Sequence, residues 1–300
     1  MNRLALVLSI CIMLTACGIS KKVIETEESH QNEKEAKMFP PVETETTNAS
    51  EEEKTEINKN TTASSGDTME ATDEEVAIET IEEITSKIFD HSKFNALLQE
   101  HVSNQGNVNY VGIRNDWQSL RDYIASLGSN MPITNWSKEE KLAYWINAYN
   151  SMTIDLILRH YPVSSIKDID NPWKQRFWKL GDKWYNLDEI EHQIIRKMGE
   201  PRIHFALVCA AVSCPKLYNH AFTAENLESS LGTLTREFLA DTSKNKIAED
   251  RIEISKIFEW FTKDFKQNGS LIDFLNKYTE VQISDTAKKK YKVYNWDLND

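Results

Sequence analysis

Cysteine is scarce in this sequence, with four residues in a chain of 300. Cys11 lies inside an apolar N-terminal segment and Cys17 follows it, so Cys209 and Cys214 are the pair left for the folded part. Outside the cytoplasm such a pair is a candidate disulfide. A further possibility is that the pair remains as two buried, unreactive thiols.

The N-terminal apolar segment is short. It runs from Leu4 to Leu14, which is too few residues to span a membrane as a helix. A positive start at Arg3 and small residues before Cys17 complete the pattern of a secretory signal. The Leu-Thr-Ala-Cys ending resembles the bacterial lipobox, which implies a lipoprotein signal peptide over residues 1–16 and lipid on Cys17. The predicted location is the extracytoplasmic face of the cell membrane, to which this lipid would bind. An ordinary signal peptide that contains a cysteine is the alternative.

Basic charge is lacking as well. The chain has a net charge of −12, and residues 18–75 hold 16 acidic and 6 basic residues, which accounts for −10 of it. The remainder is nearly balanced, so nothing predicts a nucleic-acid surface. Residues 17–75 have almost no apolar periodicity, which predicts a disordered acidic tether that follows the lipidated cysteine.

Residues 76–300 are rich in aromatic and aliphatic side chains and are enough chain for one core. We predict an α+β fold, a mainly helical single domain around a small, largely antiparallel sheet. Periodicity and caps predict helices over 80–98, 116–127, 138–160, 188–192, 223–238, 256–265 and 271–278. The same reasoning predicts hairpins over 177–186 and 246–254, an extended piece over 108–111 and an extended C-terminal segment over 291–298.

The stretch from Arg202 to Pro215 is apolar except for one histidine and two cysteines. Its composition and its flanking prolines predict a buried strand over 203–210, followed by a turn that holds Cys214. Alternation along a strand would place His204 and Cys209 on opposite faces. This favours Cys214, in the turn, as the accessible thiol.

Several motifs resemble those of the domain-of-unknown-function 547 family. They are Tyr-Trp-Ile-Asn-Ala-Tyr-Asn (144–150), Leu-Asp-Glu-Ile-Glu-His (187–192), Arg-Ile-His-Phe-Ala-Leu (202–207), Ser-Cys-Pro (213–215) and Tyr-Asn-Trp-Asp-Leu-Asn (294–299). The resemblance covers roughly residues 90 to 300 and implies a secreted or lipid-anchored bacterial protein, without implying a reaction. Asparagine is frequent in the family where this chain has Val208.

The sharpest functional hypothesis is a cysteine nucleophile. A thiolate needs a nearby base or cation, usually a histidine that a carboxylate or amide orients. Cys214 would be the nucleophile and His204 or His192 the base, with Glu191 orienting the histidine and Asn147 as a polar helper. Such a site would hydrolyse an amide or thioester, or transfer an acyl group.

Three other interpretations compete with this enzyme. A Cys209–Cys214 disulfide would remove the thiol, and a zinc site could use Glu191, His192, His204 and Cys214, although their spacing matches no closed zinc pattern. The non-enzymatic alternative is a cell-envelope module whose aromatic side chains bind a peptide or glycan. We predict no cofactor and no resident metal.

Overall fold

The structure is a computed structural model and describes residues 88–300. The signal peptide over 1–16, the lipid on Cys17, the tether over 17–75 and a domain start at residue 76 all lie outside the described residues and stay predictions. No helix between residues 88 and 300 combines the length and apolar character that a membrane crossing requires.

Helix α6 (Lys138–His160) runs through the middle of the described domain, and residues 142–158 along it are buried. The helix begins at a capping box in which Ser137 and Glu140 each accept the other's backbone N–H. It ends at His160, as predicted, because Pro162 disfavours helical geometry at Tyr161. Helix α6 is therefore the central, buried helix of the described domain.

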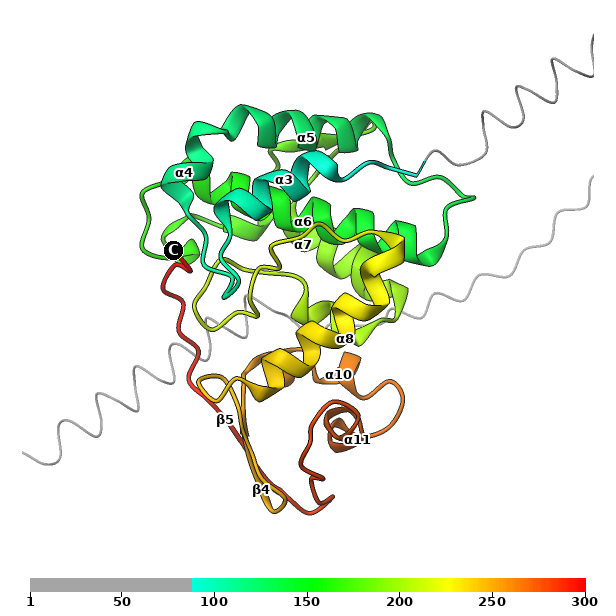
Figure 1. Ribbon diagram of the computed structural model, residues 1–300, viewed down its shortest axis with the longest axis vertical. Coiled ribbons are helices and arrows are strands. Elements are labelled where there is room, and N and C mark those ends of the chain that lie inside the picture. Colours follow the sequence, from blue (N-terminus) through cyan, green and yellow to red (C-terminus); the bar gives the residue numbers. More distant parts are fainter. Residues whose placement is uncertain (1–87) are drawn as a thin grey trace, which may run out of the picture. The chain divides into compact units, whose positions relative to one another are not determined.

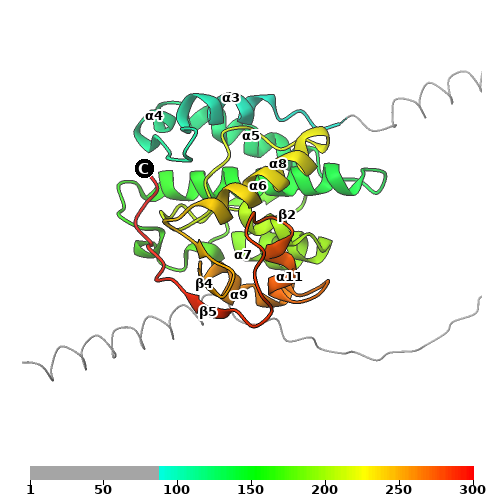
Figure 2. The same cartoon turned by 60° about the horizontal axis from the view of Figure 1, so that its bottom comes forward.

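The remaining elements lie on two sides of α6. Helices α3 (Ser92–His101), α4 (Tyr110–Asn115) and α5 (Trp117–Ser129) lie on one side, and the sheet that contains β4 and β5 lies on the other (Figures 1 and 2). After α6 the chain also forms a helical segment over 187–198, a 3-10 turn η5 (Pro201–Phe205), α8 (Ala224–Ala240), α9 (Ile257–Trp260), α10 (Thr262–Phe265) and α11 (Leu271–Asn276). The helical segment comprises α7 (Leu187–Glu189), a π-helical turn η3 (Ile190–Ile195) and η4 (Arg196–Met198).

Two small sheets complete the fold. Strands β1 (Trp178–Leu180) and β2 (Lys183–Tyr185) form the predicted antiparallel hairpin. Strand β4 (Arg251–Ile254) pairs antiparallel with β3 (Lys246–Ile247) and parallel with β5 (Lys288–Tyr291). The predicted class, mainly helical α+β with a small and largely antiparallel sheet, is confirmed.

The chain after β5 runs back across the domain to end beside α4 (Figure 1). It is extended, as predicted, and forms isolated bridges from Asp297 to Ser165 and from Leu298 to Ala211. The hydroxyl of Tyr110 in α4 donates to Asn299. The last residues of the chain therefore connect the loop around Ala211 to α4.

The predicted strand over 203–210 is wrong. Pro201 starts a 3-10 turn, Glu200 caps it by accepting the N–H of Arg202, and irregular backbone follows. The side chain of Asn150 on α6 bonds the Ala206 carbonyl and the Val208 N–H, so a buried amide satisfies backbone groups that a neighbouring strand would otherwise pair. The argument that His204 and Cys209 lie on opposite faces of a strand is lost with the strand.

Three smaller predictions also differ from the structure. Residues 88–91 are not helical, so α3 begins at Ser92 rather than within a helix from residue 80. The extended piece over 108–111 gives way to α4, because Asn109 accepts the N–H of Gly112 and caps a helix. The helix over 256–265 is two short helices, α9 and α10.

Candidate functional site

Two buried asparagine side chains on α6 form hydrogen bonds with the backbone of loops that pack against this helix. Asn147 donates to the Phe222 carbonyl at 2.7 Å and accepts the Phe222 N–H at 3.0 Å, so it pairs with both polar groups of one residue. Asn150 does the same for the backbone around Val208. An unpaired backbone group in this interior would be costly. The geometry accounts for Asn147 as a positioning residue, and its predicted role as a catalytic helper stays a prediction.

A charged cluster lies where η3, η4, η5 and α10 meet. His204 Nε2 is 2.8 Å from Asp264 Oδ2, and Arg196 bonds both oxygens of that carboxylate, at 2.6 Å from Nε and 2.9 Å from Nη2. Arg196 Nη1 also lies 3.0 Å from Nδ1 of His192, one helical turn earlier. We call these four residues, His192, Arg196, His204 and Asp264, the histidine–aspartate cluster. The bidentate contact fixes the orientation of the guanidinium.

Burial and charge set the protonation of this cluster. Desolvation lowers the pKa of His204, although its bond to Asp264 opposes the shift. Burial alone would raise the pKa of Asp264, but hydrogen bonds from His204 and Arg196 outweigh it and hold that pKa below its usual range. His204 is thus a neutral imidazole that donates to the carboxylate of Asp264, and this carboxylate in turn pairs with the guanidinium of Arg196. The ring of His204 also stacks on Phe261, with 3.9 Å between centroids.

Glu191 takes a different partner from the one predicted. Its Oε2 accepts the hydroxyl of Tyr149 at 3.0 Å, and it forms no hydrogen bond to either histidine among the described residues. Burial and the neighbouring carboxylate raise the pKa of Tyr149 well above its ordinary value, so the phenol keeps its proton and donates. The Tyr149–Glu191 pair joins α6 to η3.

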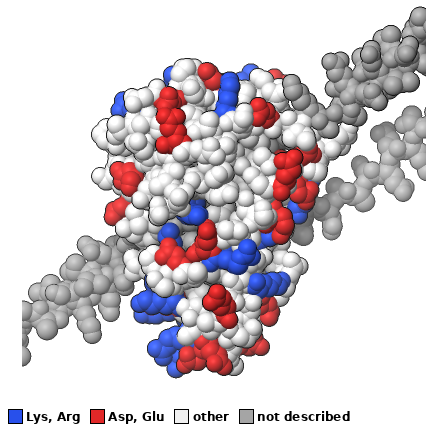
Figure 3. Space-filling view, viewed as in Figure 1, with Lys and Arg blue, Asp and Glu red and all other residues white. Residues whose placement is uncertain are grey.

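An open pocket of about 320 Å³ lies beside the histidine–aspartate cluster, and Asp264 is among its lining residues. Arg202 also lines it and is held between two carboxylates, with bonds of 2.6 to 3.0 Å to Glu200 and 2.7 Å to Glu228. The other lining residues are Gly199, Pro201, Phe265, Asn268, Phe274, Lys277 and Tyr278. On the face shown in Figure 3, Lys and Arg are interspersed with Asp and Glu, and no large area of one sign is visible.

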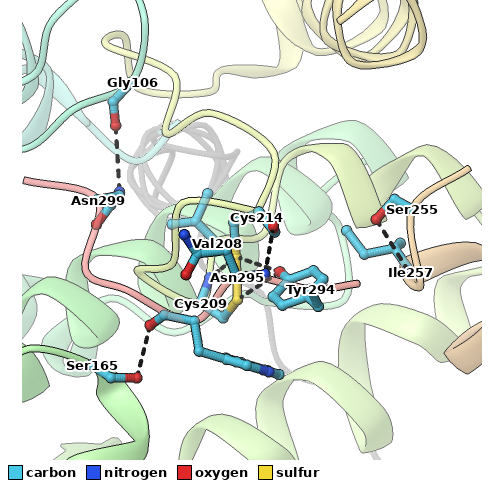
Figure 4. The surroundings of a disulfide bond; sticks show 12 residues. Gly106, Ser165, Val208, Cys209, Cys214, Ser255, Ile257, Tyr294, Asn295 and Asn299 are labelled. Carbon is cyan, nitrogen blue, oxygen red and sulfur yellow. Dashed lines mark hydrogen bonds between the residues drawn. A yellow bond between two sulfur atoms is a disulfide. The ribbon is translucent and has the colours of Figure 1, made fainter. Parts of the chain in front are cut away.

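Cys209 and Cys214 form a disulfide. Figure 4 shows it beside Tyr294, whose hydroxyl oxygen lies 3.2 Å from each sulfur. The ring of Tyr294 packs on Trp260 and Trp296, with 4.8 and 4.6 Å between centroids. Of the three states that the sequence allowed for the pair, the structure has the disulfide.

The structure divides the predicted site residues into groups. His192 and His204 meet through Arg196 and Asp264, while Glu191 pairs with Tyr149. No hydrogen bond, ion pair or ring contact joins either histidine to Cys214 in the described part of the chain. The predicted thiol–imidazole pair is therefore not assembled, and the catalytic roles of these residues stay predictions.

Comparison with known families gives a match. Residues 133–239 match the model of a family described as protein of unknown function, DUF547. This segment is a DUF547 region. No curated protein and no solved structure matches the chain. The matched segment is shorter than the stretch of 90 to 300 over which the motifs resemble the family, and the closing motif at 294–299 lies outside it.

The DUF547 region contains only part of each site. It includes His192, Arg196, Arg202, His204 and both cysteines, but Asp264 and Tyr294 come from the chain that follows. Sequence reasoning missed both, because each contacts a residue 60 to 85 positions earlier. Tyr294 belongs to a motif that we had identified, whereas Asp264 stands in a short helix without any distinguishing pattern.

The suggested zinc set of Glu191, His192, His204 and Cys214 does not converge. Among the described residues, the group whose ligand atoms lie within 4.8 Å of one another is Glu100, His101 and Asp116, near α3 and α4. His101 Nε2 already bonds Asp116 at 2.9 Å, which accounts for the closeness of two of the three. This ion pair is sufficient reason for the arrangement.

Proposed function

We propose that the chain is a lipid-anchored, extracytoplasmic binding module that takes a short cell-envelope peptide in the pocket around Arg202. The lipobox pattern at Cys17 supports the anchor. The observation that supports binding is a pocket in which cations, carboxylates and aromatic rings stand within one small volume. Pockets of a few hundred Å³ with fixed polar groups are typical of ligand sites.

The pocket offers a fixed polar framework. The hydrogen bonds that Arg202 donates to Glu200 and Glu228 raise the pKa of Arg202, and its bond to Glu228 lowers the pKa of that carboxyl, so Arg202 and Glu228 stay ionised. The guanidinium cannot turn without losing bonds to both carboxylates, and the Glu228 side chain is 80% exposed and accessible to a ligand. A site that is already ordered loses little entropy on binding.

The lining favours a peptide over a plain glycan. Glu228 could accept a peptide ammonium or amide N–H, and exposed Lys277 could pair with its carboxylate. Phe274 and Tyr278 supply an apolar surface for a side chain. A neutral sugar has no charged group that could pair with Glu228 or Lys277. The ligand that uses the whole lining is a short peptide with both ends or side chains charged.

The test is calorimetric titration of the full chain with peptides and glycans released separately from digested cell wall. We expect peptide binding, weakened about tenfold or more by Lys277→Gln or Glu228→Gln, because each change removes a charge-assisted bond. Lys288→Gln, an exposed lysine in β5, should bind like the unmodified protein. Binding of glycans alone, or no binding to either fraction, would overturn the proposal.

A cysteine-dependent hydrolase or acyltransferase is the second candidate, for a reduced form of the pair. One observation favours it: Cys214 Sγ receives the Cys209 N–H at 3.0 Å and the Tyr294 hydroxyl at 3.2 Å, and both donors would stabilise a thiolate. The reduced full chain should then release thiol from a thioester substrate, and Cys214→Ser should not. Equal rates for the two proteins would remove this candidate.

A further inference from the structure

The two sulfurs of the disulfide have unequal surroundings. Cys209 is partly exposed, whereas Cys214 is 3% exposed, so the prediction that Cys214 is the accessible thiol of the pair is wrong. The backbone donor differs as well, since the Cys209 N–H points to Cys214 Sγ. We propose that Cys209–Cys214 is a thiol–disulfide exchange site, in which an external dithiol attacks Cys209 and Cys214 leaves as a stabilised thiolate.

Access decides which sulfur is attacked. A thiolate must approach a disulfide sulfur directly, so the partly exposed Cys209 is the reachable end and the buried Cys214 is the leaving group. Val212, in the five-residue separation between the two cysteines, is 48% exposed, so this loop faces solvent. The approach therefore needs no opening of the core.

The departing sulfur would keep two donors. The Cys209 N–H at 3.0 Å and the Tyr294 hydroxyl at 3.2 Å both point to Cys214 Sγ. Hydrogen bonds to an ionised group are stronger than those to a neutral one, so both contacts gain strength as negative charge develops on this sulfur. Tyr294 is 4% exposed and packs on Trp260 and Trp296, which holds the hydroxyl in position.

The loop would keep its shape when the bond opens. The C-terminal segment binds it through Val212 N–H to the Asp297 carbonyl at 2.8 Å and Ser213 N–H to the Asn295 carbonyl at 3.1 Å. Ala210 is held at a φ of +55°, a region that residues with a Cβ seldom adopt and that clusters at functional sites. A loop this short also restricts the unfolded chain little, so the disulfide is a weak structural staple.

The exchange balances in two steps. The first thiolate of the dithiol bonds to Cys209 Sγ while the Cys209–Cys214 bond breaks, and its electron pair stays on Cys214 Sγ. The second thiol of the dithiol then loses its proton and attacks the dithiol sulfur that is bonded to Cys209. The bond between that sulfur and Cys209 Sγ breaks, and the dithiol becomes a disulfide. Cys209 is released as a thiolate and takes up a proton. The dithiol is oxidised by two electrons and the protein disulfide is reduced by two.

The experiment identifies which cysteine of the disulfide a thiol attacks in the folded, oxidised full chain. Glutathione is added without denaturant, N-ethylmaleimide traps released thiols, and peptide masses identify each adduct. We expect glutathione on Cys209 and maleimide on Cys214, and we expect dithiothreitol to complete the reduction. Glutathione on Cys214, or a disulfide that resists both reagents until denaturant is added, would overturn the proposal.

A tyrosine variant tests the stabilising donor. Tyr294→Phe should slow the release of Cys214 about tenfold, the effect of one lost hydrogen bond to a charged group. Tyr291→Phe, three residues earlier in β5, should react like the unmodified protein. Equal rates for all three proteins would contradict the role of Tyr294. If Tyr294→Phe does not fold, the adduct positions on the unmodified chain decide the proposal by themselves.

Discussion

The two ends of the stretch from His204 to Cys214 are stabilised in different ways. At one end, His204 and Arg196 contact the carboxylate of Asp264, and the charged side chains of Arg196 and Asp264 are largely buried. At the other end, Cys209 and Cys214 lie beside a neutral phenol and two indole rings. A substitution that removes a partner at the first end leaves a buried charge unpaired, whereas a substitution at the second end leaves no charge without a partner. The two ends should therefore respond very differently to substitution.

Removing Asp264 should have the largest effect. Asp264→Ala leaves the guanidinium of Arg196 without its carboxylate, and the side chains of the pair are only 13% and 12% exposed. Breaking such a pair from one side costs about 3–5 kcal/mol, because the remaining charge stays buried. Denaturant unfolding monitored by tryptophan fluorescence would measure this loss.

The control for this prediction is Asp285→Ala, since Asp285 is exposed and is not a member of the histidine–aspartate cluster. It should change the free energy of unfolding by less than about 0.5 kcal/mol. Similar losses for the two variants would show that Asp264 pairs no more strongly than a surface carboxylate, and the contrast between the two ends would fail.

His91 sharpens the comparison, because it is a buried histidine with a neutral partner. Its Nδ1 lies 2.7 Å from the Tyr123 hydroxyl, and burial lowers its pKa from 6.5 to about 4. Between these pH values the unfolded chain binds the proton and the folded chain does not, so the free energy of unfolding falls as the pH is lowered. This single group should remove about 3 kcal/mol between pH 7 and pH 4.

The measurement is urea unfolding at both pH values for the unmodified protein, His91→Gln and His220→Gln. His91→Gln should lose this part of the pH dependence, although it will be less stable at pH 7. His220 is exposed, so His220→Gln should keep the full pH dependence. A pH dependence that is the same in all three proteins would mean that His91 does not titrate as its burial requires.

Local sequence signals predicted local structure well. The capping box at Ser137, the apolar face behind it and Pro162 were enough to place both ends of α6. The glycine turn at Gly181 likewise fixed the first hairpin. The stretch after Pro201 failed, because its backbone groups bond a side chain of α6, Asn150, rather than a neighbouring strand. Composition alone cannot distinguish these two ways of satisfying a buried backbone.

The candidate site was only partly predictable for a related reason. Sequence chemistry identified His204, His192 and Cys214, since histidine and cysteine are rare and reactive. Their partners Asp264 and Tyr294 are common residue types far along the chain, and only the packing of α10 and the C-terminal segment brings them close. The charged surroundings of His204 and the neutral surroundings of the disulfide therefore arise from the tertiary structure.

The smallest effect should come from removing the disulfide. Its two cysteines are five residues apart, and the chain-entropy model gives a loop this short about 2 kcal/mol. The double variant Cys209→Ser, Cys214→Ser should therefore lose less stability than Asp264→Ala in the same unfolding experiment. Adding reductant to the unmodified protein should reproduce the loss without substitution, and reductant should leave the double variant unchanged. A loss as large as that of Asp264→Ala would show that the disulfide is a main structural support, and the end with the disulfide would then resemble the end with His204 in its contribution to stability.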